Sequence, residues 1–205
     1  MTLARARETY HHGNLAAALL DAARDMVRTH GADHLSLRAV AAVVGVSPSA
    51  AYHHFPDKDS LISGVGEALF DHLADLQEAA LARVTGEGPD AARARLRALG
   101  RGYFNWALEE PNLFRLMFGG YCQMNIAAVD ARRDQSRAWN LLKNALEDLY
   151  RHGVIRPSLR PYGEILTWSA VHGATSLIVE GRLTVESFET LLDAMEISLG
   201  IKNHE

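Results

Sequence analysis

Three polar side chains, Ser49, Tyr52 and His53, are spaced so that they would lie on one face of a short helix. Residues i, i+3 and i+4 are neighbours on a helix surface, and these three carry two hydroxyl groups and an imidazole. The chemistry they offer is hydrogen bonding. The helix, from Pro48 to about His54, is too short to be stable alone, so neighbouring elements must hold it and leave one face free for another molecule.

Other reactive residues do not form a recognisable site. Adjacent residues on a helix point about 100° apart, so neither His11–His12 nor His53–His54 would chelate a metal, and no cysteine or carboxylate cluster accompanies them. Cys122 is the single cysteine. We expect an inert, partly buried thiol there; the alternative, a redox sensor, normally needs a resolving partner or nearby positive charge. No Ser-His-Asp order or phosphate loop stands out, so we expect no metal, no cofactor and no catalysis.

Two short helices around a glycine turn would position the polar face. Ser36 is a good N-cap for the first helix, and Gly45 allows a sharp turn with positive φ. Ser47 would cap the second helix, with Pro48 at its first position. The first helix has one apolar stripe, made of Leu37, Val40, Ala41 and Val44. This layout is that of a helix-turn-helix, whose second helix enters the major groove of DNA.

The composition is compatible with DNA binding through a local footprint. The 205 residues are 48% hydrophobic, enough for one large or two small domains, and the formal net charge is −4. An N-terminal arm with Arg5 and Arg7 is either a frayed terminus or a contact to phosphate or the minor groove. No apolar run is long enough for a membrane span and no signal peptide is visible, which predicts a soluble, cytoplasmic protein.

Helical periodicity continues to the end of the chain, and no segment shows a strand pattern. We expect an all-α fold of about nine helices, with an N-terminal helix-turn-helix domain at 1–57 and a C-terminal ligand-binding and dimerisation domain at 58–205. A long helix starting at Lys58 would be the only evident mechanical link to the remainder. The helix after it has three arginines that are most simply a solvated face, Arg93, Arg97 and Arg101.

The last two helices, about 162–180 and 185–199, are expected to pair with a second copy of the chain. The first has a track of small residues that permits close approach, and the second has an apolar stripe. Two such helices resemble half of a four-helix bundle, which suggests a homodimer with isologous symmetry. The candidate interface residues are Ser169, Gly173, Ser176, Phe188, Leu191, Leu192 and Met195.

Four segments near the N-terminus together resemble the DNA-binding domain of TetR-family transcriptional regulators. They are YHHGNL at 10–15, LSLR at 35–38, GVSP at 45–48 and YHHFPDK at 52–58. The resemblance covers about residues 10–70 and is specific, because the spacing joins a turn, a recognition helix and the cap of a following helix. A less specific resemblance to a WHG-type ligand-binding domain rests on Trp168, His172 and Gly173.

The resemblance implies DNA contacts for the residues around the recognition helix. Ser49 and Ala50 would meet base edges, the alanine only through a thymine methyl group. The other hydroxyl and imidazole groups would donate to phosphate or to a base edge, and Lys58 would bind phosphate beside free N–H groups at a helix start. The complete set of candidates is Arg38, Ser47, Ser49, Ala50, Tyr52, His53, His54 and Lys58.

Some of these residues have a second interpretation. Tyr52 could be a rim aromatic of the domain core, His54 could be half-buried against a preceding helix that is expected at about 14–29, and Lys58 could be a solvated lysine. The recognition helix contains no Arg, Asn or Gln, the usual bidentate readers of bases. Sequence discrimination would therefore rest partly on Arg38, on the N-terminal arm or on DNA shape.

Large apolar and amphipathic side chains are unusually frequent in the C-terminal half. Most are hydrophobic core in the simplest interpretation, whereas the resemblance implies that some line an apolar cavity for a small molecule. Tyr121, Trp168 or His172 would then orient the ligand. The candidate pocket residues are Trp106, Phe114, Met117, Phe118, Tyr121, Trp139, Trp168 and His172.

These observations together predict a homodimeric transcriptional regulator, most simply a repressor that a small-molecule effector releases from a palindromic, double-stranded operator. The ligand would change the angle of the long helix and so the spacing of the two recognition helices. Two alternatives stay open. One is a ligand-independent DNA-binding regulator, and the other is a helical small-molecule-binding protein whose helix-turn-helix is incidental.

Overall fold

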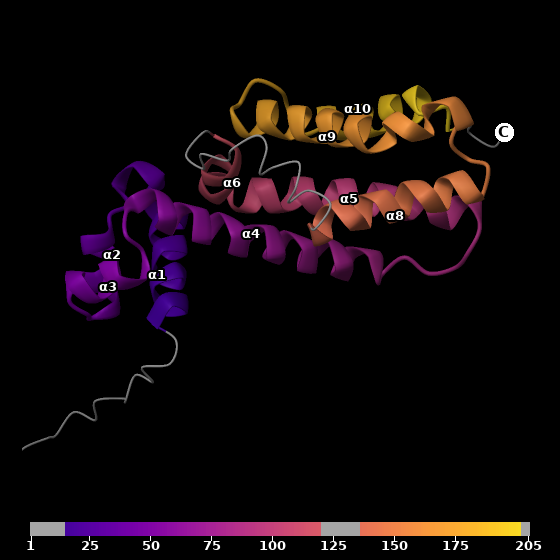
Figure 1. Ribbon diagram of the computed structural model, residues 1–205. Coiled ribbons are helices and arrows are strands. Elements are labelled where there is room, and N and C mark those ends of the chain that lie inside the picture. The colour runs from indigo at the N-terminus through magenta and orange to yellow at the C-terminus, as the bar shows by residue number, and fades with distance from the viewer. Residues whose placement is uncertain (1–14, 120–135, 202–205) are drawn as a thin grey trace, which may run out of the picture.

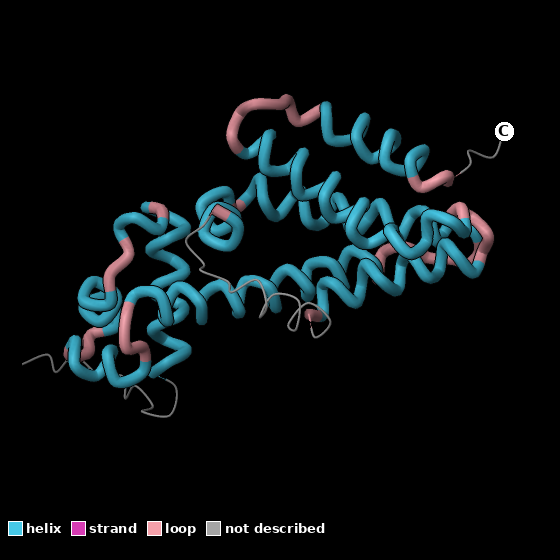
Figure 2. The backbone as a smooth tube through the Cα atoms, turned by 45° about the horizontal axis from the view of Figure 1, so that its top comes forward, coloured by secondary structure: helices cyan, strands magenta, loops and turns pink. Residues whose placement is uncertain are grey.

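The computed structural model describes residues 15–119 and 136–201, which form nine α-helices and two 3-10 helices without a strand (Figure 1; Figure 2). The all-α prediction is confirmed. The α-helices are α1 Leu15–His30, α2 Leu37–Val44, α3 Pro48–His54, α4 Lys58–Leu81, α5 Pro89–Glu109, α6 Pro111–Phe118, α8 Arg137–Arg151, α9 Gly163–Val179 and α10 Ser187–Ser198. The 3-10 helices are Ala32–His34 and Pro157–Tyr162.

Helices α1, α2 and α3 form a small unit at one end of the molecule, which we call the reading head (Figure 1). The predicted caps are present: Ser36 Oγ accepts from the Ala39 N–H and Ser47 Oγ accepts from the Ala50 N–H, both at 3.2 Å. Gly45 ends α2 with φ 79°, a left-handed conformation that strains any residue with a side chain. The turn between α2 and α3 therefore follows from these residue types.

Helix α4 begins in the reading head and continues into the rest of the molecule. Asp57 and Ser60 form a reciprocal capping box at its start, with Asp57 Oδ1 2.7 Å from the Ser60 nitrogen. Its first turns approach α1 closely, because a Cβ added at Gly64 would lie 2.9 Å from Leu20 Cδ2. Its later turns pack on α5 and α8. The predicted domain boundary before Lys58 thus falls at the start of a helix that contacts both parts.

The remaining helices form the body of the molecule. In Figure 1, α4 lies on one side, α5 and α8 form a middle layer, and α9 and α10 form the outer layer. The helix contacts agree, since α5 and α8 touch both α4 and α9, while α10 packs on α9. Helix α6 lies at the end of the body next to the reading head and packs on α1. The expectation that the long helix is the only mechanical link between the two parts is therefore wrong.

Arginines of α5 pair with carboxylates of α10, so the prediction of a solvated face is wrong for the half-buried Arg93 and Arg97, whereas Arg101 is exposed. Arg97 Nε donates to Glu196 at 2.6 Å, and its other nitrogens pair with Glu189 and Asp193. Arg101 makes two further bonds to Glu189 at 2.8 Å. The sequence could not show that three carboxylates lie opposite, because α10 is about 90 residues away along the chain.

Other differences from the sequence prediction are small. The last two helices span Gly163–Val179 and Ser187–Ser198, against the expected 162–180 and 185–199. Predictions for Arg5, Arg7, Tyr121 and Cys122 lie outside the described residues. None of the described helices is both long and apolar enough to cross a membrane.

Candidate functional site

Helix α3 has one buried face and one exposed polar face. Ala51 is fully buried against the reading head, and Val46 and Phe55 pack beside it. Ser49, Tyr52 and His53 are exposed, with Tyr52 44% accessible. The division into faces is the one that the spacing predicts. What remains open to another molecule is a row of hydroxyl and imidazole groups.

The other candidates in α3 and at its cap differ in exposure. Ser47 is exposed, and although its Oγ accepts the capping bond its O–H can still donate. Ala50 is half-buried. His54 is exposed, so the interpretation that it is half-buried against α1 is wrong; its ring centroid lies 6.2 Å from that of His53.

The two cations predicted to border this face lie on different helices. Arg38 is exposed in the first turn of α2. Lys58, the first residue of α4, is half-buried, and its Nζ donates to the Ala32 carbonyl oxygen at 3.0 Å. An ammonium group has three donors, so two remain for other acceptors. Lys58 is therefore not a freely solvated lysine, but its ammonium group still has donors for another acceptor.

A second group of functional candidates forms an aromatic cluster in the body. Phe118 of α6 lies 4.7 Å from His172 and 5.2 Å from Phe114 between ring centroids, and Trp168 stacks on His172 at 5.4 Å. We define the aromatic cluster as Phe70, Tyr103, Trp106, Phe114, Phe118, Trp168 and His172. It joins α4, α5, α6 and α9, so any change in its volume would displace several helices.

Two members of the aromatic cluster, Phe70 and Tyr103, are not among the pocket residues that the sequence predicts, although Tyr103 lies one turn before Trp106 on the same face of α5. The Tyr103 hydroxyl is 2.7 Å from His172 Nδ1. Burial raises the pKa of Tyr103 and lowers the pKa of His172, so the contact joins two neutral groups. Ser176 Oγ lies 3.5 Å from His172 Nε2.

Several buried polar atoms of the body make no hydrogen bond in the part of the chain that the structure describes. Among them are Trp106 Nε1, on a side chain that is 2% exposed, Gln77 Oε1 on α4, and the hydroxyls of Thr167 and Thr175 on α9. Buried polar groups normally have partners, so each is available to a ligand atom. The remaining pocket candidates differ in burial: Met117 is buried in α6, and Trp139 is half-buried at the start of α8.

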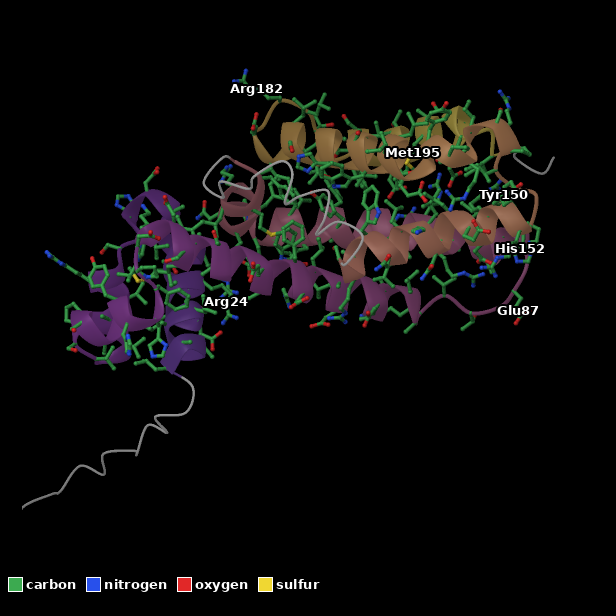
Figure 3. All side chains as sticks on the ribbon, in the orientation of Figure 1. Arg24, Glu87, Tyr150, His152, Arg182 and Met195 are labelled. Atoms are coloured by element: carbon green, nitrogen blue, oxygen red, sulfur yellow. The ribbon has the colours of Figure 1, made fainter. Side chains whose placement is uncertain are left out.

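The structure has a shallow hollow of about 180 Å³ in a different place, between α9 and α10. Its lining is almost entirely apolar and includes Leu166, Leu191 and Met195. It is smaller than the roughly 300 Å³ at which ligand pockets begin. Figure 3 shows Met195 at the α9–α10 pair, in the outer layer. This hollow does not involve the aromatic cluster.

The predicted pairing surface needs one correction. Phe188 and Leu192 are 1% and 0% exposed, because α10 turns them inward, and Phe188 stacks on Phe104 with centroids 3.8 Å apart. They cannot meet a second chain. Met195 is buried as well, at 5% exposure, where it lines the hollow between α9 and α10. Ser169 is exposed, and Gly173, Leu191 and Ser176 are half-buried, Ser176 beside His172. Large apolar residues are instead exposed around them on α9, namely Ile165, Leu166, Trp168 and Leu177.

Comparison with protein families identifies both parts of the chain. A family described as bacterial regulatory proteins, tetR family, matches residues 19–65. A family described as tetracyclin repressor-like, C-terminal domain, matches residues 96–195. No curated protein sequence matches the chain.

Solved structures give the same fold over nearly the whole chain. A protein of unknown function from Rhodococcus sp. RHA1 is 27% identical, with a TM-score of 0.76, and the match covers 96% of this chain and 100% of that one. A TetR family transcription regulator from Marinobacter aquaeolei VT8 is 26% identical, with a TM-score of 0.64 and coverage of 89% and 94%. A TetR-family transcriptional regulator from Pectobacterium atrosepticum shares the fold at 23% identity, with a TM-score of 0.67 and coverage of 92% and 94%.

A helix-turn-helix with an exposed recognition helix, attached to an all-helical body, defines this protein as a DNA-binding transcriptional regulator. The chain belongs to the TetR family.

Proposed function

We propose that this protein is a homodimeric repressor that binds a palindromic operator and is released from it by a small-molecule effector. The observation that carries the proposal is the exposed polar face of α3, opposite the buried Ala51. Two such helices, about one turn of DNA apart, would enter successive major grooves. Its task is binding rather than catalysis, in the cytoplasm where its DNA lies.

The proposed DNA contacts follow from exposure and chemistry. Ser49, Tyr52 and His53 would donate to base edges or phosphates from the centre of the face, with Ala50 touching a thymine methyl group. Ser47 and His54 would reach the backbone. Arg38 and Lys58 would bind phosphate from either side, Lys58 through the donors that the Ala32 carbonyl leaves unused.

The second chain is proposed to cover the exposed apolar residues of α9 and the hollow beside α10. Four large apolar side chains on one helix of the outer layer, Ile165, Leu166, Trp168 and Leu177, are 40–51% accessible. An apolar surface of this kind normally marks an interface. A twofold axis there would pair α9 and α10 with their copies in a four-helix bundle.

The aromatic cluster is proposed as the region that senses the effector. Its polar groups, Tyr103 and His172, are neutral, which favours an uncharged, largely apolar molecule. The unpaired Trp106 N–H would donate to an acceptor atom on that molecule. Binding would release the operator only if the effector prefers one of two arrangements of the helices.

A mobility-shift assay with full-length protein and DNA flanking its own gene tests the proposal. We expect a sequence-specific complex containing two chains per site, which unlabelled random DNA does not displace at equal concentration. A protein that binds no DNA in 50 mM salt would overturn the proposed function. Specific binding that no apolar small molecule weakens would leave a ligand-independent regulator instead.

A further inference from the structure

Polar side chains on one edge of helix α6 donate hydrogen bonds to backbone carbonyl groups at the C-terminal ends of two other helices. The last four carbonyl groups of an α-helix have no partner inside it. Asn112 Nδ2 donates to the Arg28 carbonyl oxygen near the end of α1, and Arg115 Nη2 donates to that of Val179 at the end of α9, both at 3.0 Å. Because Arg115 Nη1 also donates to Asn112 Oδ1 at 3.3 Å, one run of hydrogen bonds joins α1, α6 and α9.

An ion pair strengthens the junction between α1 and α6. Arg28 Nε lies 2.8 and 3.0 Å from the two carboxylate oxygens of Glu110, the residue before α6, although 82 positions separate them in the chain. Arg28 Nη1 donates to Asp25 at 2.7 Å, which fixes the guanidinium in this orientation. Such charge-assisted bonds are stronger than neutral ones. We define Arg28, Glu110 and Asn112 as the α1–α6 clamp.

The opposite side of α6 is buried in the aromatic cluster. Phe114 is 4% exposed, and Phe118 meets His172 at 4.7 Å and Phe70 of α4 at 5.9 Å between ring centroids. One short helix therefore contacts the reading head with its polar edge and the proposed sensing region with its apolar face. A displacement of α6 must either move α1 or break the clamp.

We propose that the α1–α6 clamp positions the reading head on the body and so sets the separation of the two α3 helices in the dimer. This rests on the proposed function. Without the clamp, the reading head is held through the start of α4 and the apolar contact of α1 with α6, and it can pivot more freely. A freer reading head would accept operators whose half-sites are spaced differently. The clamp residues are thus positioning residues for DNA recognition rather than DNA contacts.

The test compares affinities for operators of altered spacing. A duplex is first selected from randomised DNA by the full-length wild-type protein. A second duplex has one base pair inserted between the half-sites, which increases the distance between them by about 3.4 Å. The variants are Arg28→Gln and Glu110→Gln. Arg24→Gln is the matched control, since it removes the same charge from the same helix, while the pairs of Arg24 with Asp21 and Asp25 stay within α1.

We expect the wild type and Arg24→Gln to prefer the selected duplex by the same ratio. In both clamp variants that ratio should fall about two- to fivefold, the range for a partly exposed ion pair. Glu110→Gln separates the clamp from general electrostatics, because losing a negative charge by itself would strengthen DNA binding without changing the ratio. Circular dichroism should show equal helicity in all four proteins, since Arg28 and Glu110 are 44% and 24% exposed.

Equal ratios in the wild type and the clamp variants would contradict the positioning role of the clamp. The proposed DNA-binding function would not be affected by that result. Selection of no duplex by the wild-type protein would overturn the proposed function, and the clamp proposal would fall with it.

Discussion

At the level of single residues, the exposed face of α3 is rich in hydroxyl and imidazole groups and has neither guanidinium nor carboxamide. A bidentate pair with a base edge discriminates by about 1–3 kcal/mol, and α3 has no residue that makes one. Each contact proposed for Ser49, Tyr52 and His53 is a single hydrogen bond. We therefore expect affinity to depend on phosphate contacts and specificity to depend partly on Arg38 and on DNA deformation.

Replacement of Lys58 by methionine should weaken operator binding for all sequences alike. Removing one phosphate contact should flatten the dependence of log Kd on log salt by about one unit. Titrations at several salt concentrations measure this slope. Lys143→Met is the matched control, because Lys143 is exposed on α8 in the body. An unchanged slope in Lys58→Met would show that its ammonium serves only the Ala32 carbonyl.

His172 should make the stability of the protein depend on pH. Burial holds the pKa of His172 below its ordinary value of 6.5, so below pH 6.5 the unfolded chain binds more protons than the folded one. The stabilisation is fully present above pH 6.5 and is lost as the pH falls toward the lower folded pKa. A fall in pH from 7.5 to 5.0 should therefore lower the Tm of the wild type more than that of His172→Gln. Thermal unfolding at several pH values measures this difference. Parallel Tm curves for the two proteins would contradict the assignment.

At the level of elements, the helices and their ends follow from the sequence far more completely than their contacts do. Caps at Ser36, Ser47 and Asp57 and the left-handed Gly45 act within a few residues, so spacing alone predicts the helix-turn-helix correctly. The inward orientation of Phe188 and the pairing of Arg97 with Glu196 depend on which face of α10 meets α5. An amphipathic pattern indicates which face of a helix is buried. Both faces of α10 carry apolar residues, since Ile197 is 71% exposed, so the pattern does not identify the buried face.

The ion pairs between α5 and α10 should contribute measurably to folding. Arg97→Met leaves the carboxylate of Glu196, which is 5% exposed, with only the longer contact to Arg93 Nε at 3.9 Å in place of the Arg97 bond, and should destabilise the protein by about 2 kcal/mol. Urea unfolding followed by circular dichroism measures the loss. Arg151→Met is the control: its ion pair with Glu147 is 71% exposed on the arginine side and should contribute less than about 0.5 kcal/mol. Equal losses in the two variants would refute the structural role of Arg97.

At the level of the whole molecule, the reading head and the proposed pairing surface lie in different parts of the structure (Figure 1). Figure 3 places Arg24 in the reading head and Tyr150 and His152 at the opposite end of the body. Two routes connect the reading head to the body, α4 and the packing of α1 on α6. The sequence predicted the first route and missed the second, because Arg28 and Glu110 are both surface residues without a distinguishing pattern.

Replacement of Leu166 by glutamate should convert the proposed dimer to a monomer. The change buries a charge in the proposed pairing surface without a partner, which is strongly unfavourable. Tyr150→Glu is the control, since Tyr150 is 43% exposed and Leu166 is 41% exposed, yet Tyr150 lies on α8 rather than α9. Sedimentation equilibrium should give a monomer for Leu166→Glu and a dimer for Tyr150→Glu. If both variants are dimers, the pairing surface does not include Leu166.

The operator affinity of a variant that alters only the exposed face of α3 tests the placement of that face on DNA. Ser49→Glu puts a negative charge at the centre of the face, where it would meet phosphates and base edges, and Asn144→Glu, which adds the same charge at an exposed position of α8, is the matched control. We expect Ser49→Glu to lose at least about 100-fold in affinity for the selected duplex, since burying a charge without a partner costs several kcal/mol. Wild-type affinity in Ser49→Glu would contradict the placement of α3 in the major groove.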